Sequence, residues 1–430
     1  MSLGVADFAR ARRSLCLCLV LAALLAAPRL CEAASFLDQF SAPEIHGFLE
    51  TRVGGRTQHD PDEKELSVGD MRLQGEASTY SDWAELKYKG DLWYDGVTNK
   101  VRYDTREAWV FSRPTDYLDL KLGRQILTWG TGDLVFLNDL FPKDWQSFFI
   151  GRDDEYLKAP SNSAKASLFS DLCTVDLVYT PLFDSDRFIT GEYVSYWNSD
   201  LQKIAGRDDR LNYRKPKRWF ADAEYAARVY KNYEAYETAL YGYWGFWKAP
   251  GGQTSEGEHI FPRLNVYGAS VRGPVGAGIG NAEVAFYDSI EDQTGANSMI
   301  NNSEMRYLVG YAQELFKDLT GSIQYYVEQL LEYSNYRDNM ESGHPRDRFR
   351  QVITLQITQL LMKQNLELAL SGYYSPSDQD AYLRPKIHYK YTDHLSQEIG
   401  ANIFFGEHEY TMFGQYRYDT NVYMALRYSF

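Results

Sequence analysis

The sequence predicts an all-β fold: a single closed antiparallel transmembrane β-barrel of about 18 strands, with about 16 as the alternative count. Segments in which apolar and polar residues alternate follow one another from His46 onward. Aromatic residues make up 15% of the chain, yet its mean hydropathy is −0.46. In a barrel, lipid-facing residues alternate with polar lumen residues and cancel in such an average. This combination is typical of a barrel and unusual for a soluble enzyme.

The N-terminal region predicts export. Arg10, Arg12 and Arg13 precede an apolar run over 15–27, and "CEA" at 31–33 supplies small residues for cleavage. A basic region, a short apolar region and a small-residue exit describe a secretory signal peptide. A retained anchor is the alternative, but the run is short for a membrane-spanning helix. We therefore predict a signal peptide over 1–33 and one barrel domain over 34–430.

Cysteine use and charge narrow the function. Three of the four cysteines lie in the predicted signal peptide, so the mature chain keeps Cys173 and has no internal disulfide framework. Removing four arginines and two acids from 45 basic and 59 acidic residues leaves 41 and 57. This acidic balance argues against a nucleic-acid binder.

The predicted strands follow from alternation and from the turn residues between them. In 117–130, Leu118, Leu120 and Leu122 share one face, and Gly123 marks a bulge. Two stretches, 220–240 and 322–333, also fit amphipathic helices, but they carry no helix caps and we predict strands. The predicted strands cover 46–55, 67–79, 83–96, 101–114, 117–130, 164–170, 173–181, 219–232, 236–248, 263–274, 278–290, 304–315, 320–333, 350–363, 366–376, 381–393, 395–407 and 421–430.

The lipid environment requires the sheet to close. Every backbone N–H and C=O group in lipid needs a partner, so we expect the strand over 46–55 to pair with the strand over 422–430. Aromatic rings favour the membrane interface. On that ground we predict a girdle, with packing in a soluble sandwich as the alternative, at Tyr241, Tyr243, Trp247, Tyr373, Tyr374, Tyr389 and Tyr391.

The segment "NVYMALRYSF" at 421–430 resembles the C-terminal signal of bacterial outer-membrane barrels, which end in an alternating strand with a terminal aromatic residue. Leu426, Tyr428 and Phe430 carry the resemblance. It implies the Gram-negative outer membrane as the location, after export by a cleaved signal peptide. It also implies three partners: the barrel-assembly machinery, outer-membrane lipid and lipopolysaccharide.

A second segment, "LKLGRQILTWGTGDLVFLNDLFPKDW" at 120–145, contains "LGRQ…WG". It resembles a strand of porin-like barrels of the alginate-export type and their uncharacterised relatives. The resemblance implies 18 strands and a passive channel. A basic bore, expected of an alginate exporter, does not fit this acidic chain, so we expect passage of a small polar or anionic solute instead. The alternative is a plugged, non-conducting barrel that acts as a binding or structural anchor.

The stretch over 131–163 is the candidate functional site. It is long for a hairpin connection, and an exposed loop would have little reason to carry its many large apolar residues. We predict that it folds into the lumen, because an 18-stranded barrel is too wide for wall side chains to fill. A surface lid or a plug is the alternative. The predicted constriction residues are Arg124, Lys143, Arg152, Asp153 and Asp154, since charges at a constriction set selectivity.

The sequence gives only weak signals for anion binding, metal binding or catalysis. A second long loop over 182–218 ends in the basic residues Arg214, Lys215, Lys217 and Arg218, which form either a solvated edge or a site for phosphate or an anionic solute. Paired aspartates follow Arg152 and Arg207, but no loop has EF-hand spacing. The seven histidines form no HExxH motif, and no GxSxG motif is present. We predict no metal, no cofactor and no enzymatic activity.

Overall fold

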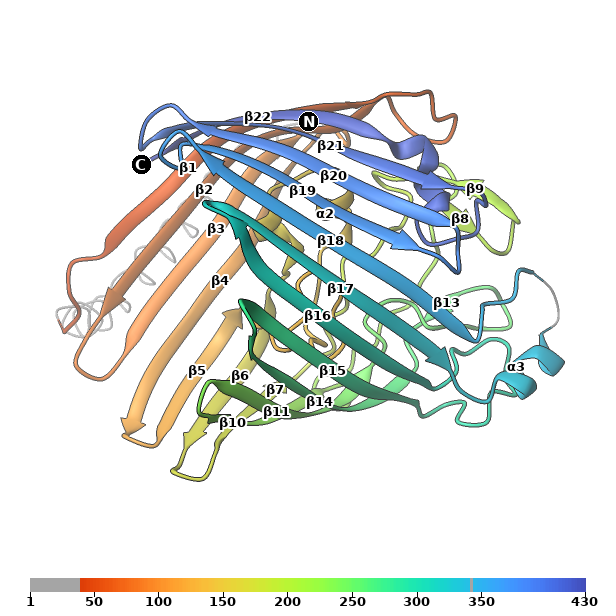
Figure 1. Ribbon diagram of the computed structural model, residues 1–430, viewed down its shortest axis with the longest axis horizontal. Coiled ribbons are helices and arrows are strands. Elements are labelled where there is room, and N and C mark those ends of the chain that lie inside the picture. Colours follow the sequence, from red (N-terminus) through yellow and green to blue (C-terminus); the bar gives the residue numbers. More distant parts are fainter. Residues whose placement is uncertain (1–38, 341–342) are drawn as a thin grey trace, which may run out of the picture.

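The computed structural model describes residues 39–340 and 343–430, so the predicted signal peptide lies outside the described residues. The chain forms one 18-stranded antiparallel sheet that closes into a barrel (Figure 1). Its strands are β1 (Glu44–Arg56), β2 (Leu66–Tyr80), β3 (Glu85–Asp95), β4 (Lys100–Thr115), β5 (Leu118–Gln125), β6 (Ser161–Phe169), β7 (Thr174–Thr180), β10 (Glu224–Tyr233), β11 (Tyr236–Phe246), β14 (Arg263–Val275), β15 (Gly278–Ser289), β16 (Glu304–Phe316), β17 (Leu319–Leu330), β18 (Phe349–Leu361), β19 (Leu366–Ser375), β20 (Asp380–Lys390), β21 (Leu395–Gly406) and β22 (Asn421–Ser429). This confirms the predicted fold and strand count.

Short elements lie in the connections. They are α2 (Trp145–Phe149), η1 (Asp154–Leu157), β8 (Tyr196–Asn198), β9 (Lys203–Ala205), β12 (Gly252–Gln253), β13 (His259–Ile260), α3 (Tyr333–Asn339) and η2 (Gly414–Asp419). Across the described ranges 39–340 and 343–430, none of the helices is long and apolar enough to cross a membrane. Both stretches that also fit a helix are mainly strands: β10 and β11 cover most of the first, and β17 covers most of the second.

The closing seam joins the first and last strands, as predicted. β1 and β22 pair from Phe48 opposite Ser429 to Arg56 opposite Asn421. Beyond this ladder, Gly47 and Phe430 exchange two backbone hydrogen bonds of 3.0 Å each. The seam therefore leaves no open edge between these strands, which is the condition for a sheet in lipid.

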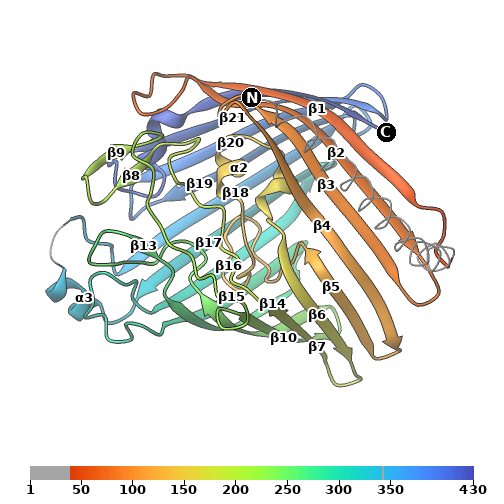
Figure 2. The same ribbon diagram turned by 180° about the vertical axis from the view of Figure 1, so that it is seen from behind.

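The two ends of the barrel differ in their connections. At the short-turn end, connections such as 116–117, 234–235, 276–277 and 317–318 have two residues, and the described chain begins and ends there (Figures 1 and 2). At the long-loop end lie the long connections, which are 57–65, 126–160, 181–223, 247–262, 290–303, 331–348 and 407–420. Short turns at one end and long loops at the other are typical of outer-membrane barrels.

The outer face of the wall is apolar. On β22, Val422, Met424 and Leu426 are about half exposed, whereas Tyr423 and Ala425 on the opposite face are buried. Exposed aromatic rings gather near both ends. Near the short-turn end they include Tyr80, Tyr117, Phe169, Tyr233, Tyr236, Phe316, Tyr391 and Tyr428, and near the long-loop end Tyr94, Tyr103, Tyr225, Trp244, Tyr267, Tyr374 and Phe405. These two belts frame an aliphatic band, as the membrane interfaces require.

The predicted girdle is wrong for four of its seven residues. Tyr241, Tyr243, Trp247 and Tyr373 are buried within the barrel. On β11 the outward face carries Leu240, which is 62% exposed. Alternation separates two faces of a strand but does not say which one meets lipid when both carry apolar residues.

Replacing Gly47 with valine is expected to destabilise the closing seam. A Cβ atom at Gly47 would meet the backbone oxygen of Gln74 and the ring of Phe430. Overpacking of this kind costs about 1–3 kcal/mol. Gly47→Val should therefore lower the temperature at which the folded band unfolds on mildly denaturing gels.

The matched control is Gly75→Val. Gly75 lies opposite Gly47 on β2, and a Cβ atom there meets nothing within 4 Å. Equal shifts for the two variants would contradict the contact between Gly47 and Phe430.

Candidate functional site

The connection between β5 and β6, residues 126–160, turns into the barrel and is named the inner loop. Its helix α2 lies within the ring of strands in both views (Figures 1 and 2). Its contacts with inward-facing wall residues confirm the predicted position in the lumen. The bounds differ slightly from 131–163, because β5 ends at Gln125 and β6 begins at Ser161.

Glu283 on β15 fixes the first bend of the inner loop. Its carboxylate accepts hydrogen bonds from the backbone N–H groups of Thr131 and Gly132. It also accepts from the Thr131 hydroxyl at 2.7 Å and from the side-chain amide of Asn138 at 2.8 Å. The side chain is buried. Several donors offset the cost of burying the charge, so this carboxylate holds the bend through hydrogen bonds alone.

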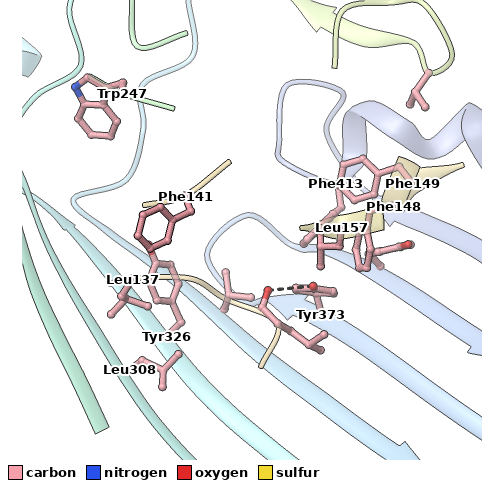
Figure 3. Close-up of a cluster of buried hydrophobic side chains, with 14 of the residues drawn as sticks. Leu137, Phe141, Phe148, Phe149, Leu157, Trp247, Leu308, Tyr326, Tyr373 and Phe413 are labelled. Carbon is pink, nitrogen blue, oxygen red and sulfur yellow. Dashed lines mark hydrogen bonds between the residues drawn. The ribbon is translucent and has the colours of Figure 1, made fainter. Parts of the chain in front are cut away.

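Two wall tyrosines hold the next turn. The Tyr287 hydroxyl donates to the backbone oxygen of Leu137 at 2.5 Å, and the Tyr373 hydroxyl donates to that of Leu134 at 3.1 Å. The second bond is the dashed line at Tyr373 in Figure 3. A loop in a lumen has no sheet partner for its carbonyl groups, and these hydroxyls supply one.

Ion pairs hold the end of the inner loop to the opposite wall. Arg152 lies 2.7 Å from Asp70 on β2. The next two carboxylates reach β22 and β20: Asp153 lies 2.8 Å from Arg427, and Asp154 contacts Arg384 and lies 2.9 Å from Lys386. The inner loop thus crosses the bore and is fixed to both sides of the wall.

Tyr156 in η1 packs between two arginines of the wall. The guanidinium carbons of Arg72 and Arg106 lie 4.5 and 4.8 Å from the centre of its ring. Arg106 also donates to the backbone oxygens of Glu155 and Lys158, at 2.9 Å each. Stacking and hydrogen bonding together hold this turn against β2 and β4.

The apolar side of the inner loop packs on an aromatic wall. The ring centre of Phe149 lies 5.0 Å from that of Tyr416, 5.5 Å from Tyr382 and 5.6 Å from Phe404. Such pairs each add about 0.5–1.5 kcal/mol beyond area burial. This packing accounts for the apolar residues that the sequence places in the loop.

A second loop, 181–223, covers the inner loop from the long-loop end. Arg187 bridges Asp144 of the inner loop (3.1 Å) and Asp104 of β4 (2.6 Å). Nearby, Ser195 donates to Asp419 at 2.8 Å. The first part of this loop is therefore part of the site, rather than the basic cluster at its end.

The predicted constriction residues differ in how far their side chains are exposed to the bore. Lys143 and Arg152 are buried in ion pairs, Lys143 with Asp139 at 3.0 Å. Arg124 on β5 is partly exposed and lies 3.4 Å from Asp104, and the Asp154 side chain is half exposed. Asp153 is bound by Arg427 and also caps η1. Lys143 and Arg152 thus hold the loop in shape, and their role in a constriction stays a prediction.

The wall residues that position the inner loop were missed from the sequence. Glu283 and Tyr287 stand in no motif. A usable signal existed in Glu50 and Arg52, which share the inner face of β1 and are both buried. Charged residues that repeat on the inner face of a strand, in the middle of the wall, need partners inside the lumen. Arg52 donates to the backbone oxygen of Gly151 at 2.6 Å and to the carboxylate of Glu398 at 2.7 Å.

Toward the short-turn end, the lumen is lined by partly exposed ion pairs. Lysine and arginine alternate with acids across neighbouring strands, as in Lys87–Glu107 (3.3 Å), Lys165–Asp176 (3.4 Å) and Arg228–Glu237 (2.7 Å). This part of the bore therefore offers solutes a balanced polar surface. Within residues 39–340 and 343–430, no three His, Cys, Asp or Glu side chains are grouped to hold a metal ion.

A carboxylate cluster lies at the rim of the long-loop end. Arg56 lies 2.7 Å from Asp419 and 3.9 Å from Asp60, and Glu63 is buried beside them. Burial raises the pKa of Glu63 to about 7, with Arg56 opposing and Asp419 adding to the rise. Burial likewise raises the pKa of Asp419 to about 7 against the attraction of Arg56. We therefore expect the stability of the loops that carry these groups, 57–65 and 407–420, to depend on pH.

Known proteins share the fold but little sequence. No family model and no curated protein matches the chain. Among solved structures it is similar to OccK5 (OpdH) of Pseudomonas aeruginosa, with 8% identity and a TM-score of 0.52 over 90% of this chain and 97% of that one. OccAB1 and OccAB3 of Acinetobacter baumannii give 11% and 10% identity and TM-scores of 0.52 and 0.51, over 90% of this chain and 96% and 99% of theirs. The likeness is one of fold.

Replacing Glu283 with glutamine is expected to loosen the inner loop. Thr131, Gly132 and Asn138 all donate hydrogen bonds to the Glu283 carboxylate. Glutamine replaces one carboxylate oxygen with an NH2 group, which cannot accept, so the hydrogen bonds to that oxygen are lost. Hydrogen bonds to a charged group contribute about 1.5–3 kcal/mol each. Amide hydrogen exchange of residues 126–140 should therefore speed up by tenfold or more, on the order of 2 kcal/mol.

Glu107→Gln is the control for this variant, because Glu107 also faces the lumen but contacts Lys87 rather than the inner loop. Unchanged exchange over 126–140 in Glu283→Gln, or an equal increase in Glu107→Gln, would contradict the anchoring role.

The rim is expected to be more stable in acid. The pKa values of Glu63 and Asp419 are higher in the fold than their ordinary values of 4.5 and 3.8. Their contribution is therefore complete below pH 4 and is lost as pH rises through about 7. Hydrogen exchange over 57–65, corrected for its intrinsic rate, should be slower at about pH 5.5 than at about pH 8.5.

Glu63→Gln should reduce that pH dependence, and the part due to Asp419 should remain. Glu65→Gln should leave the pH dependence unchanged, because Glu65 is exposed on the same loop and contacts His59. An undiminished pH dependence in Glu63→Gln, or a loss of the pH dependence in Glu65→Gln, would contradict the assignment.

Proposed function

We propose that the protein is an outer-membrane channel for passive passage of a small polar or anionic solute, not an enzyme. The observation that carries the proposal is the inner loop, which is fixed across the bore by wall side chains. A loop folded into a wide barrel narrows the bore while the sheet around it stays closed. Outer-membrane barrels place short turns in the periplasm and long loops outside, so the long-loop end faces the exterior.

Selectivity is proposed to arise from the partly exposed charges beside the inner loop. Arg124, Arg187 and Asp104 form one group between β4, β5 and the second loop. Rings of charge at a constriction set ion preference. Of the predicted constriction residues, Arg124 and Asp154 are the ones that a passing solute would meet.

The second candidate is a plugged barrel that binds a partner or forms a structural anchor. It is favoured by the extent of the loop packing, because the aromatic rings around Phe149 are buried and the loop contacts both sides of the wall. Planar-bilayer recordings separate the two functions. A channel gives a steady open level, whereas a plugged barrel gives none.

Replacing Arg124 with glutamine is expected to shift the reversal potential in a KCl gradient toward cation preference, since one positive charge leaves the narrow region. Arg113→Gln is the control, because Arg113 pairs with Asp119 at the short-turn end and is well exposed. A steady open level with no shift in Arg124→Gln, or with an equal shift in both variants, would overturn the role of Arg124.

The C-terminal strand and the segment over 120–145 carry the remaining parts of the proposal. The ending with Leu426, Tyr428 and Phe430 is proposed as the signal for the barrel-assembly machinery, and lipopolysaccharide as a partner of the outer face. The resemblance to alginate-export-type barrels rests on residues 120–145, in which Gly123 adopts a positive φ of 127° before the chain leaves the wall. That conformation favours glycine, but Gly123 pairs in regular register with Trp109 and Ser163, so the bulge predicted there is wrong.

A further inference from the structure

A cavity of about 300 Å³ lies between the inner loop and the wall formed by β14–β19, on the long-loop side. Figure 3 shows the labelled side chains in two groups, with Leu137, Phe141 and Tyr326 on one side and Phe148, Phe149 and Phe413 on the other. The lining is dominated by aromatic rings, which are Phe136, Phe141, Trp145, Phe148, Phe149, Trp247, Tyr287, Tyr326, Tyr373 and Phe413. An aromatic chamber of this kind is not needed to pass ions through a polar bore.

The tyrosine hydroxyls of this chamber are already bonded. Those of Tyr287 and Tyr373 donate to backbone oxygens of the inner loop, and Tyr326 donates to Glu328 at 2.9 Å. With their hydroxyls used within the protein, the tyrosines offer mainly ring surface to an occupant. The chamber therefore attracts apolar and aromatic groups.

The basic side chains of the lining have counter-charges within the protein. Arg306 lies 2.7 Å from Glu304, and Arg350 lies 2.7 Å from Asp378. Lys143 and Lys248 are likewise paired, with Asp139 and Glu224 respectively. A charged solute would lose its hydration and find no uncompensated partner, so a neutral solute is favoured.

A more polar cavity of about 500 Å³ continues from the chamber into the outer loops. The two cavities share Glu328, Arg350 and Met412. The outer one is lined by polar groups of loops 331–348 and 407–420, including Arg346 and His408. A solute with one polar end would place that end at Glu328 and Arg350 and its apolar body among the rings.

We propose that the chamber selects neutral aromatic compounds that carry a hydroxyl group, with one ring or two fused rings. This inference rests on the proposed channel function and narrows its solute from small polar or anionic compounds to neutral ones that carry an aromatic body. The size agrees, because a cavity of about 150 Å³ lined by apolar side chains holds one benzene. The hydroxyl end would exchange hydrogen bonds with Glu328 and Arg350, while the rings replace water at the aromatic lining.

The test uses single-channel recordings of the full-length, membrane-inserted protein, with 2-naphthol added at the long-loop side. Neutral 2-naphthol is expected to interrupt the current in resolved events. The charged analogue 2-naphthoate should act at a concentration about tenfold higher or more, a difference of roughly 1.4 kcal/mol. Glucose, which is polar without an apolar body, should give no resolved events.

Val352→Asp places an uncompensated charge on the chamber wall from β18, where Val352 is buried. It should weaken the effect of 2-naphthol about tenfold or more. Thr358→Asp is the matched control on the same inward face of β18 and outside the chamber, and it should leave the effect unchanged. If Val352→Asp fails to show heat-modifiable migration, Val352→Thr replaces it, with a several-fold weakening expected.

Failure of this inference is distinct from failure of the channel function. A steady current that 2-naphthol does not interrupt, or that 2-naphthoate interrupts equally well, overturns the aromatic preference and leaves the channel standing. Absence of any steady current overturns the channel. In that case quenching of tryptophan fluorescence by 2-naphthol in lipid nanodiscs decides whether the chamber binds it, with Val352→Asp as the variant that must weaken quenching.

Discussion

The pairing of every backbone polar group in lipid is the constraint on which the whole structure depends. It forces 18 strands into one ring and brings β1 against β22. A ring of this size encloses more space than its own side chains can fill. The inner loop is thus a consequence of the size of the barrel. Once the sheet closes, the lumen is filled either by water or by part of the polypeptide, and in this protein residues 126–160 fill part of it.

The inner loop in turn determines which wall residues are charged. Its backbone has no ladder partner, so the wall supplies hydrogen bonds to it from four side chains: Glu283, Tyr287, Tyr373 and Arg106. Buried arginine–carboxylate pairs are weak evidence for stability in themselves, but removing one partner is costly. Their value lies in fixing one arrangement of the loop, which leaves the aromatic chamber on the long-loop side and the lumen lined by ion pairs toward the short-turn end. The same loop therefore shapes both the constriction and the solute class proposed for it.

Much of the fold could be predicted because the period of two is a local property of the sequence. Strand positions, the strand count, the closing seam and the entry of the long loop into the lumen all follow from alternation and from the need to close. The direction of each face did not follow, as Tyr241 and Tyr373 show, because both faces of these strands carry aromatic residues. The site was predictable only in part: the sequence marks the inner loop, but not that Lys143 and Arg152 are buried in ion pairs while Arg124 and Asp154 stay partly exposed. Asp139 and Asp70, the partners of the two buried residues, are fixed by the path of the loop and by contacts far away in the chain, which no spacing reveals.

The anchors of the inner loop also impose an order on folding. Glu283 lies 152 residues beyond Thr131, Tyr373 lies 239 beyond Leu134, and Arg427 lies 274 beyond Asp153. Contacts of such long sequence separation form late, since the entropy of closing the intervening chain must be met first. The loop therefore cannot reach its final position until β15, β19 and β22 have joined the wall. Until the loop is seated, a closed barrel encloses a wider bore than the final structure does, so the width of the bore is set by the last contacts to form.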